Sequence, residues 1–152
     1  MVSVELLRRY KFFLRFNENQ LKGIALISNL QSFGKGSLVV KENSDATHLF
    51  LLISGDINLV YSGAGEDSGG NVLVGSLAPG DVFGVSSLIE PYQFISSVKN
   101  VSDVEVISID AYALRALAEL DPHLGYTLMR QISACVLERL KFTQMELAQA
   151  RV

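Results

Sequence analysis

Between Phe33 and Asp110 the chain consists of short runs rich in Val, Ile, Leu and Phe, separated by glycine, asparagine and aspartate. Short apolar runs with turns at these intervals are typical of an all-β sandwich or barrel. We expect a tight reversal at Gly55-Asp56 and a hairpin tip at 63–70. The strands are expected at 37–41, 49–54, 57–62, 71–77, 94–101 and 104–109.

Helical patterns flank this β-rich region. Residues from about 2 to 30 read as helical, and Asn17 with Gln20 is typical of a capping box. Asp110 caps a segment that runs through Glu119, and Asp121-Pro122 supplies an N-cap and a proline at the first helical position. The last helix then continues to about residue 149. We therefore expect one mainly β domain with flanking helices: N-terminal helices (1–30), an all-β sandwich or barrel (31–110) and C-terminal helices (111–152).

Composition excludes several functional classes. The chain has 152 residues and a formal net charge of −3, so we expect it not to bind nucleic acid by itself, since phosphate contacts need a basic surface. No apolar run is long enough for a membrane span. A single cysteine, Cys135, and the lack of a secretory signal favour the cytoplasm. His48 and His123 are too few for a metal site, and no catalytic arrangement supports an enzyme.

The stretch 80–84, Gly-Asp-Val-Phe-Gly, is similar to a phosphate-binding loop that lacks its charged residues. Its two glycines bracket a short turn, and residues 86–89 after it have helical character. Such a turn directs backbone N–H groups and a helix N-terminus towards an anion. We therefore expect a ligand site here, completed by the segment 94–98.

Four segments follow in order: FGKG at 33–36, LFLLISGDI at 49–57, LAPGDVFG at 77–84 and VEVISID at 104–110, with Leu140 in the last helix. In this order they resemble the cyclic nucleotide-binding domain, the sensor module of Crp/Fnr regulators, protein kinase A regulatory subunits and gated ion channels. The resemblance covers nearly the whole chain. It implies that residues 31–110 form an eight-stranded β-roll, a jelly-roll or double-stranded β-helix. It also implies cAMP or cGMP as ligand, and a dimer that passes the ligand signal on through the C-terminal helix.

Two positions depart from this family. Val85 follows Gly84, where ligand-binding members commonly carry a glutamate for the ribose hydroxyl. Phe94 stands where the spacing places the arginine that pairs with the cyclic phosphate, and a one-residue gap would place it at Gln93 or Ile95 instead. Since none of these side chains is cationic, we expect cyclic nucleotide binding to be weak or lost.

The site expected from the resemblance is a degenerate phosphate-binding cassette. Two alternatives remain open beside a weakened nucleotide site: a sensor for a non-nucleotide apolar ligand, and a ligand-free interaction module. The candidate ligand-binding residues are Gly84, Val85, Ser86, Ser87, Phe94, Ile95 and Ser96.

The last helix carries apolar residues close to a 3.5-residue repeat, which is typical of helix pairing. We expect its first half to pack on the β-roll and its second half to pair with a second copy of the chain. Because Crp/Fnr regulators carry a winged helix-turn-helix after this helix, the effector is either a further domain or a separate partner. The residues expected in the homodimer are Leu128, Ile132, Cys135, Arg139 and Phe142.

Overall fold

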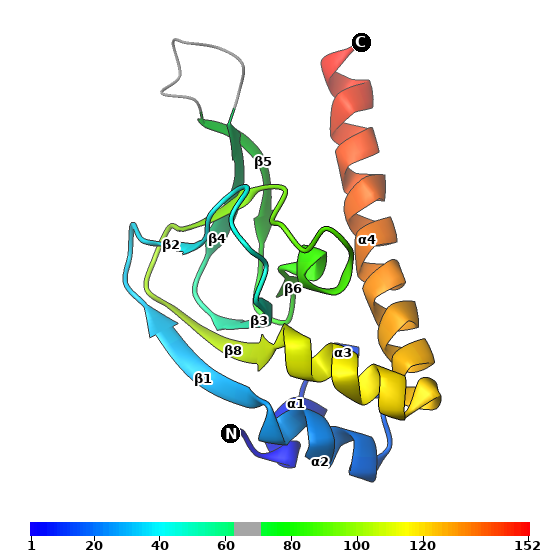
Figure 1. Ribbon diagram of the computed structural model, residues 1–152. Helices are drawn as coiled ribbons and strands as arrows, with labels where there is room; N and C mark the ends of the chain where they lie inside the picture. Colours follow the sequence, from blue (N-terminus) through cyan, green and yellow to red (C-terminus); the bar gives the residue numbers. More distant parts are fainter. Residues whose placement is uncertain (63–70) are drawn as a thin grey trace.

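The computed structural model describes residues 1–62 and 71–152, so the hairpin tip expected at 63–70 lies outside the described residues. Helices precede and follow the β-strands in the chain. In Figure 1 the N-terminal helices lie below the strands, and the long C-terminal helix runs along one side of them. The helical elements are α1 (Val4–Arg8), the short 3-10 helix η1 (Lys11–Phe13), α2 (Glu18–Leu26), the 3-10 helix η3 (Val85–Leu88), α3 (Ala111–Leu120) and α4 (Pro122–Ala150).

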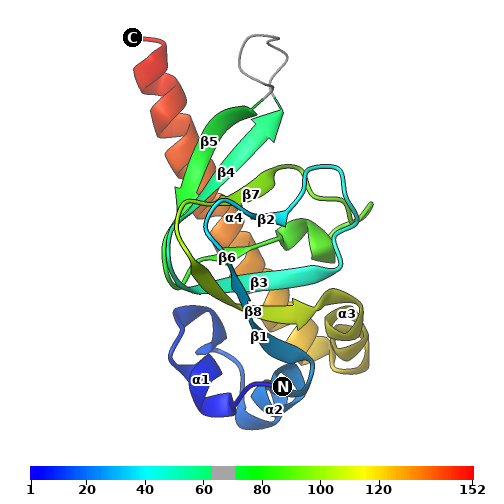
Figure 2. The same ribbon diagram turned by 90° about the vertical axis from the view of Figure 1, so that its left-hand side faces the viewer.

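Eight strands form two four-stranded antiparallel sheets, in the orders β1-β8-β3-β6 and β2-β7-β4-β5. Figure 2 shows the strands wrapped into a roll above the N-terminal helices. The jelly-roll fold expected from the sequence is therefore confirmed. The strands are β1 (Ser28–Phe33), β2 (Leu38–Val40), β3 (His48–Ser54), β4 (Ile57–Ser62), β5 (Asn71–Leu77), β6 (Val82–Phe83), β7 (Ser97–Asn100) and β8 (Val104–Asp110).

Strand β3 shows how the sheet separates two hydrophobic cores. Its alternate residues Leu49 and Leu51 pack with the helices in an outer core. Phe50 and Leu52 point the other way and join the inner core between the two sheets. Because side chains alternate across a strand, an uninterrupted apolar run fits a strand that is covered on both faces. This double coverage explains the run at 49–53.

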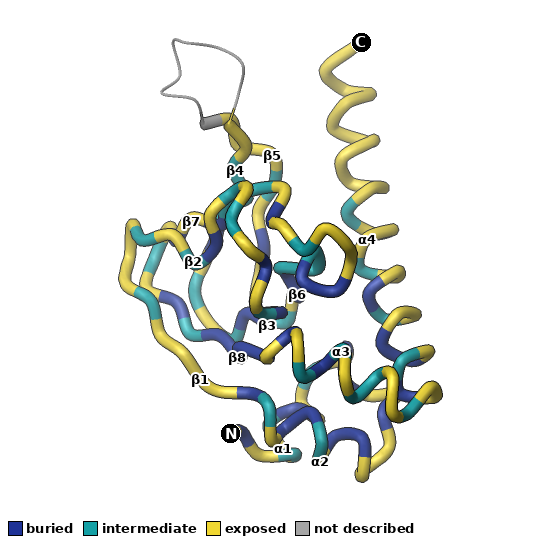
Figure 3. Tube along the Cα trace, viewed as in Figure 1, coloured by how far each residue is buried: buried dark blue, intermediate teal, exposed yellow. Residues whose placement is uncertain are grey.

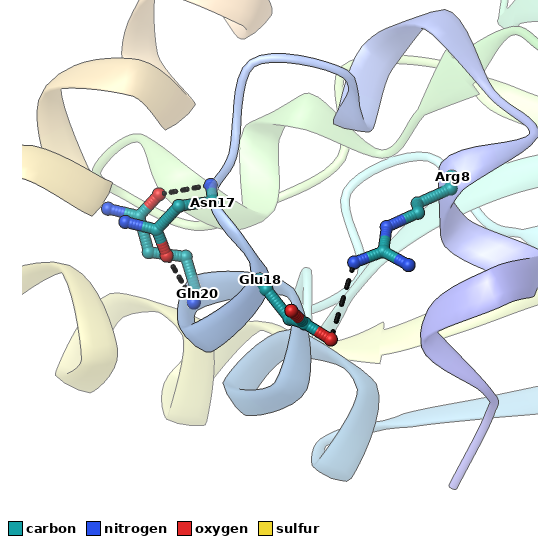
Figure 4. A network of polar contacts seen from close by, with 4 residues as sticks. All are labelled: Arg8, Asn17, Glu18 and Gln20. Carbon is teal, nitrogen blue, oxygen red and sulfur yellow. Dashed lines mark hydrogen bonds and ion pairs between the residues drawn. The ribbon is translucent and has the colours of Figure 1, made fainter.

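The N-terminal region contains the expected capping box. The Asn17 side chain accepts a hydrogen bond from the Gln20 N–H (2.8 Å), and the Gln20 side chain accepts one from the Asn17 N–H (2.9 Å; Figure 4). Arg8 forms an exposed ion pair with Glu18 nearby (3.5 Å). The expectation of continuous helix over 2–30 was too broad, because β1 begins at Ser28 and pairs with β8 along its whole length.

Two strand predictions also need correction. Residues 82–83 form β6, which pairs with β3 through only two residue pairs, and a strand this short has no readable period. The strand expected at 94–101 begins at Ser97, because residues 94–96 are held by loop contacts. The Phe94 N–H donates to the Ser44 carbonyl (3.0 Å), and its carbonyl accepts from the Asn43 N–H (2.8 Å).

Helix α4 spans 29 residues and starts at the predicted cap. The Asp121 carboxylate accepts hydrogen bonds from the N–H groups of His123 and Leu124, and the Gln20 amide donates to it as well. These bonds fix the start of α4 beside α2. Figure 3 shows buried positions along the first half of α4 and exposed ones along the second.

Candidate ligand cavity

The predicted cassette forms a tight turn between β6 and η3. Gly84 has a left-handed backbone conformation (φ +76°), and a Cβ there would lie 3.0 Å from the His48 carbonyl oxygen. Both observations require a glycine, because other residues are strained at positive φ and this space is already occupied. The cassette backbone is thus retained for reasons independent of any ligand charge.

A cavity of about 600 Å³ lies between this turn, the second sheet and α4. This volume is in the range of pockets that hold small organic ligands. Most of its wall is apolar. The lining residues that the argument uses are the cassette turn at 83–86, the loop at 94–96, Leu59 and Tyr61 on β4, and Arg139, Phe142, Thr143 and Glu146 on α4.

The structure brings six of the seven expected ligand residues together: Gly84, Val85, Ser86, Phe94, Ile95 and Ser96 all line the cavity. Ser87 is the exception. Its side chain is fully buried, and its hydroxyl has no hydrogen-bond partner among the described residues. Ser87 is not among the residues that line the cavity, so its expected ligand contact stays a prediction that the cavity geometry does not support. Successive residues of a 3-10 helix such as η3 point to different sides, so Ser87 does not share the direction of Ser86.

Phe94 is part of the protein core as well as of the cavity wall. Its side chain is only 7% exposed and packs in the inner core with Phe50 and Phe83. Phe50 and Phe83 stack with ring centroids 5.0 Å apart. Val85 on the opposite side of the turn is half-buried and packs against the outer core. The two positions that depart from the family pattern therefore carry packed apolar side chains.

Helix α4 provides the charged part of the wall, Arg139 and Glu146. Arg139 and Phe142, which we expected in a dimer interface, also line the cavity, and their place in an interface stays a prediction. Leu128 and Ile132 are buried in the outer core of their own chain, and Cys135 packs partly against it. A side chain covered by its own domain is not accessible to a partner, so Leu128 and Ile132 are corrected from interface to core residues.

Burial changes two pKa values on this face of α4. Burial lowers the pKa of the Arg139 guanidinium, although the neighbouring Cys135 and Asp81 oppose that effect. Arginine keeps its proton throughout the physiological range in spite of such a shift. Burial also raises the pKa of the Cys135 thiol, so the thiol stays protonated at neutral pH and lacks the thiolate character of a reactive cysteine.

Arg115 connects the cassette with α3. Its guanidinium donates a hydrogen bond to the Ser87 carbonyl in η3, and it lies 4.0 Å from the centre of the Tyr92 ring. A cation over an aromatic face and a charge-assisted hydrogen bond each stabilise this contact. Since α3 leads directly into α4, the cassette and the C-terminal helices are mechanically linked.

Sequence reasoning placed the cassette in the cavity but missed the contribution of α4 and of β4. A usable signal was present. Arg139 and Phe142 continue the helical face that carries Leu128, Ile132 and Cys135, and the first half of this helix was expected to pack on the roll. A straight helix keeps such a face on one side, so the later residues reach the roll too. The β4 side chains carried no comparable signal.

Across residues 1–62 and 71–152, no helix combines the length and apolar character that a membrane span requires. Within the same residues, no group of three or more His, Cys, Asp or Glu side chains is placed to hold a metal ion.

Among solved structures, the chain is similar to a protein of Geobacter metallireducens described as a candidate cyclic nucleotide-binding protein. The two are 44% identical with a TM-score of 0.83, covering 92% of this chain and 99% of the other. The catabolite activator protein of Thermus thermophilus has the same fold, with 19% identity and a TM-score of 0.70 over 92% of this chain and 62% of that one.

A curated relative is the CRP-like cAMP-activated global transcriptional regulator of Mycobacterium tuberculosis, 29% identical over 82% of this chain. The chain spans about half the length of that relative (53%). The model of the cyclic nucleotide-binding domain family matches residues 30–121. That match includes the cassette, both sheets and α3, and it spans more than half of the sequence. The chain therefore belongs to the cyclic nucleotide-binding domain family.

Proposed function

We propose that the chain is a regulatory sensor domain in which cyclic nucleotide binding is weak or lost. The observation that carries this proposal is the apolar wall at Val85 and Phe94, the positions where the family resemblance places the partners of the ribose and the phosphate. The cavity and the cassette backbone supply the frame of a ligand site. The cassette side chains do not supply its charge.

The energetic consequence follows from the missing arginine. A hydrogen bond to a charged group contributes roughly 1.5–3 kcal/mol, so its loss weakens binding by about ten- to a hundredfold. A cyclic phosphate placed against Phe94 also loses water without gaining a partner there, which adds to the cost. Backbone N–H groups of the turn and the Ser86 and Ser96 hydroxyls remain as neutral donors.

Titration calorimetry with cAMP and with cGMP tests the proposal. We expect no measurable heat below millimolar ligand, and micromolar binding of either nucleotide would overturn it. The substitution pair Val85→Glu with Phe94→Arg tests the alignment by restoring both charges. Because Phe94 is a core residue, the single variant Val85→Glu serves as the better-folding control. We expect cAMP binding to increase from wild type to Val85→Glu to the double variant.

We propose that such a sensor passes its ligand signal on through α4. Arg139, Phe142 and Thr143 belong both to the cavity wall and to this helix, so a ligand that fills the cavity changes the contacts of α4. The Arg115 contact gives η3 a second connection to the same helices. Regulation of transcription, as in the Mycobacterium relative, is proposed to need an effector domain or partner in addition to the residues given.

A second candidate function is homodimerisation through α4, which a separate observation favours. The apolar residues Met129, Val136, Leu140 and Leu147 on α4 are exposed, and their spacings of seven, four and seven residues fit the a and d positions of a heptad. We name this set the outer seam. Its spacing is that of the apolar contact line in a two-stranded coiled coil.

Removal of residues 140–152 separates the two candidates. None of these residues is buried, so the β-roll should stay folded, although the cavity loses Phe142, Thr143 and Glu146 from its wall. Self-association in sedimentation experiments should be lost. A truncated chain that still sediments as the full-length chain does would eliminate the outer seam as the interface. If the truncated chain dissociates and no small molecule binds the full chain, the ligand-free interaction module is the better description.

The proposed setting is the cytoplasm, and the proposed role is non-catalytic. The named relatives are regulators and binding domains rather than enzymes, which supports a binding role for the cavity.

A further inference from the structure

Arg139 is the one cationic side chain among the described residues that line the cavity. It belongs to α4 and shares the cavity wall with Phe83, Phe94 and the cassette turn. It is half-buried, and burial lowers its pKa without removing its charge at physiological pH. The cavity therefore carries a fixed positive charge that comes from the helix and not from the cassette.

Within residues 1–62 and 71–152 the carboxylates of Asp81 and Glu138 favour this charge from a distance, but neither forms an ion pair with it. Arg139 takes part in no ion pair there, and its guanidinium donates no hydrogen bond to those residues. Glu146 lines the same cavity but lies beyond ion-pair distance. A guanidinium offers five N–H donors in a planar fork that matches a carboxylate. Against apolar walls its attraction for an anion is stronger than in open water.

The remaining wall defines the rest of the ligand. Leu59, Phe83 and Phe94 favour an aromatic or aliphatic body, and Val85 offers no partner for a ribose hydroxyl. The carboxylate of Glu146 at the same cavity repels a second negative charge on the ligand. A dianion and a polar nucleoside are both disfavoured by this combination.

We propose that the cavity binds a monocarboxylic acid with an apolar body, and that Arg139 holds the carboxylate. The inference rests on the proposed function in one respect, namely that the domain senses a ligand other than a cyclic nucleotide. It assigns the counter-charge to α4, so an occupied cavity draws this helix towards the cassette. Ligand binding and the position of α4 are then one event.

The test compares 2-naphthoate with its neutral analogue 2-naphthamide by titration calorimetry on the full chain. We expect wild type to prefer the acid by roughly ten- to a hundredfold, the range of a charge-assisted hydrogen bond. Arg139→Gln should abolish most of this preference, whereas Arg139→Lys should retain part of it. Arg130→Gln is the matched control, because Arg130 is an exposed arginine on α4 that does not line the cavity.

Equal affinity of wild type for the acid and the amide would overturn the role of Arg139. Absence of binding by both probes up to millimolar concentration would overturn the acid as ligand class. An equal loss of acid preference in Arg130→Gln and Arg139→Gln would also overturn the role of Arg139, since it indicates a general charge effect. Each variant is first checked for an unchanged melting temperature, and Arg139→Lys serves in place of Arg139→Gln if the latter does not fold.

Two further measurements place the probe and count its charges. Amide NMR shifts caused by 2-naphthoate should concentrate in the turn at 84–86 and the loop at 94–96, and shifts confined elsewhere would contradict the site. Naphthalene-2,6-dicarboxylate should bind wild type more weakly than 2-naphthoate and gain more from Glu146→Gln. The nucleotide titrations decide the proposed function separately, because they fail or succeed whatever the naphthoate result.

Discussion

The two halves of α4 have similar shares of apolar residues but different environments. Residues 122–135 include the buried Leu124, Leu128 and Ile132, which belong to the outer core. Along 136–150 every residue except Arg139 is exposed, although apolar side chains continue (Figure 3). Val136, Leu140 and Leu147 are 44%, 49% and 47% exposed. Apolar content alone therefore does not tell which part of a long helix is core, since the neighbouring elements decide it.

The difference predicts where stability resides. Leu128→Ala should lower the free energy of unfolding by about 2–5 kcal/mol, the range for removing a buried leucine side chain. Leu147→Ala, on the exposed half, should change it by less than about 0.5 kcal/mol in the monomer. Urea denaturation at low protein concentration measures both. A similar loss for the two variants would show that the second half is also covered in the monomer.

Self-association should have the opposite dependence. Leu140→Glu places a charge in the middle of the outer seam, and we expect it to weaken dimerisation by at least about tenfold, because a charge there loses water without a partner. The unfolding free energy of the monomer should be unchanged. Leu120→Glu is the control, because Leu120 is an exposed leucine at the end of α3. If both variants associate equally in sedimentation equilibrium, the outer seam is not the interface.

The smallest expected effect concerns the start of the buried half. The hydrogen bond from the Leu124 N–H is the main cause that lowers the pKa of Asp121 below its ordinary value, and the Gln20 amide adds to it. A lowered pKa in the folded state stabilises the protein above the unfolded value of about 3.9. That contribution is lost as the pH falls through the lower folded value.

Asp121→Asn keeps an acceptor at the cap but removes the charge. Wild type should melt at a higher temperature than this variant near neutral pH, and the difference should shrink below about pH 4. Thermal unfolding followed by circular dichroism across pH measures it. A difference that is constant with pH would mean that the Asp121 charge does not contribute to the start of α4.

The sequence predicted the main elements because their signals are local. The Asn17 and Gln20 capping box, the Asp121-Pro122 helix start and the apolar run of β3 each depend on residues close together in the chain. β1 and β6 were missed because they carry no such local signal. β1 lacks a clear alternation, and β6 has two residues, so each is a strand because a partner strand lies beside it.

The candidate site divides in the same way. Gly84 and the loop at 94–96 were predicted from motif order, and the structure places them at one cavity. Spacing alone could not show whether Leu128, Ile132 and Arg139 face a partner or the roll of their own chain. Successive residues of a helix are rotated by only about 100°. A repeat of apolar residues therefore fits a face towards the roll and a face towards a partner almost equally well.

The sequence by itself determined the all-β centre of the chain, its flanking helices and the apolar residues of the cassette, because each follows from short-range pattern and residue type. The β-roll was implied by the order of the family motifs. Only the tertiary structure decided that α4 closes the cavity and that Arg139 supplies its positive charge. The position of α4 at the cavity depends on the angle at which this helix leaves α3 and passes the roll. It is set by packing in the outer core and by the Asp121 cap, where Gln20, far away in the sequence, meets the start of the helix.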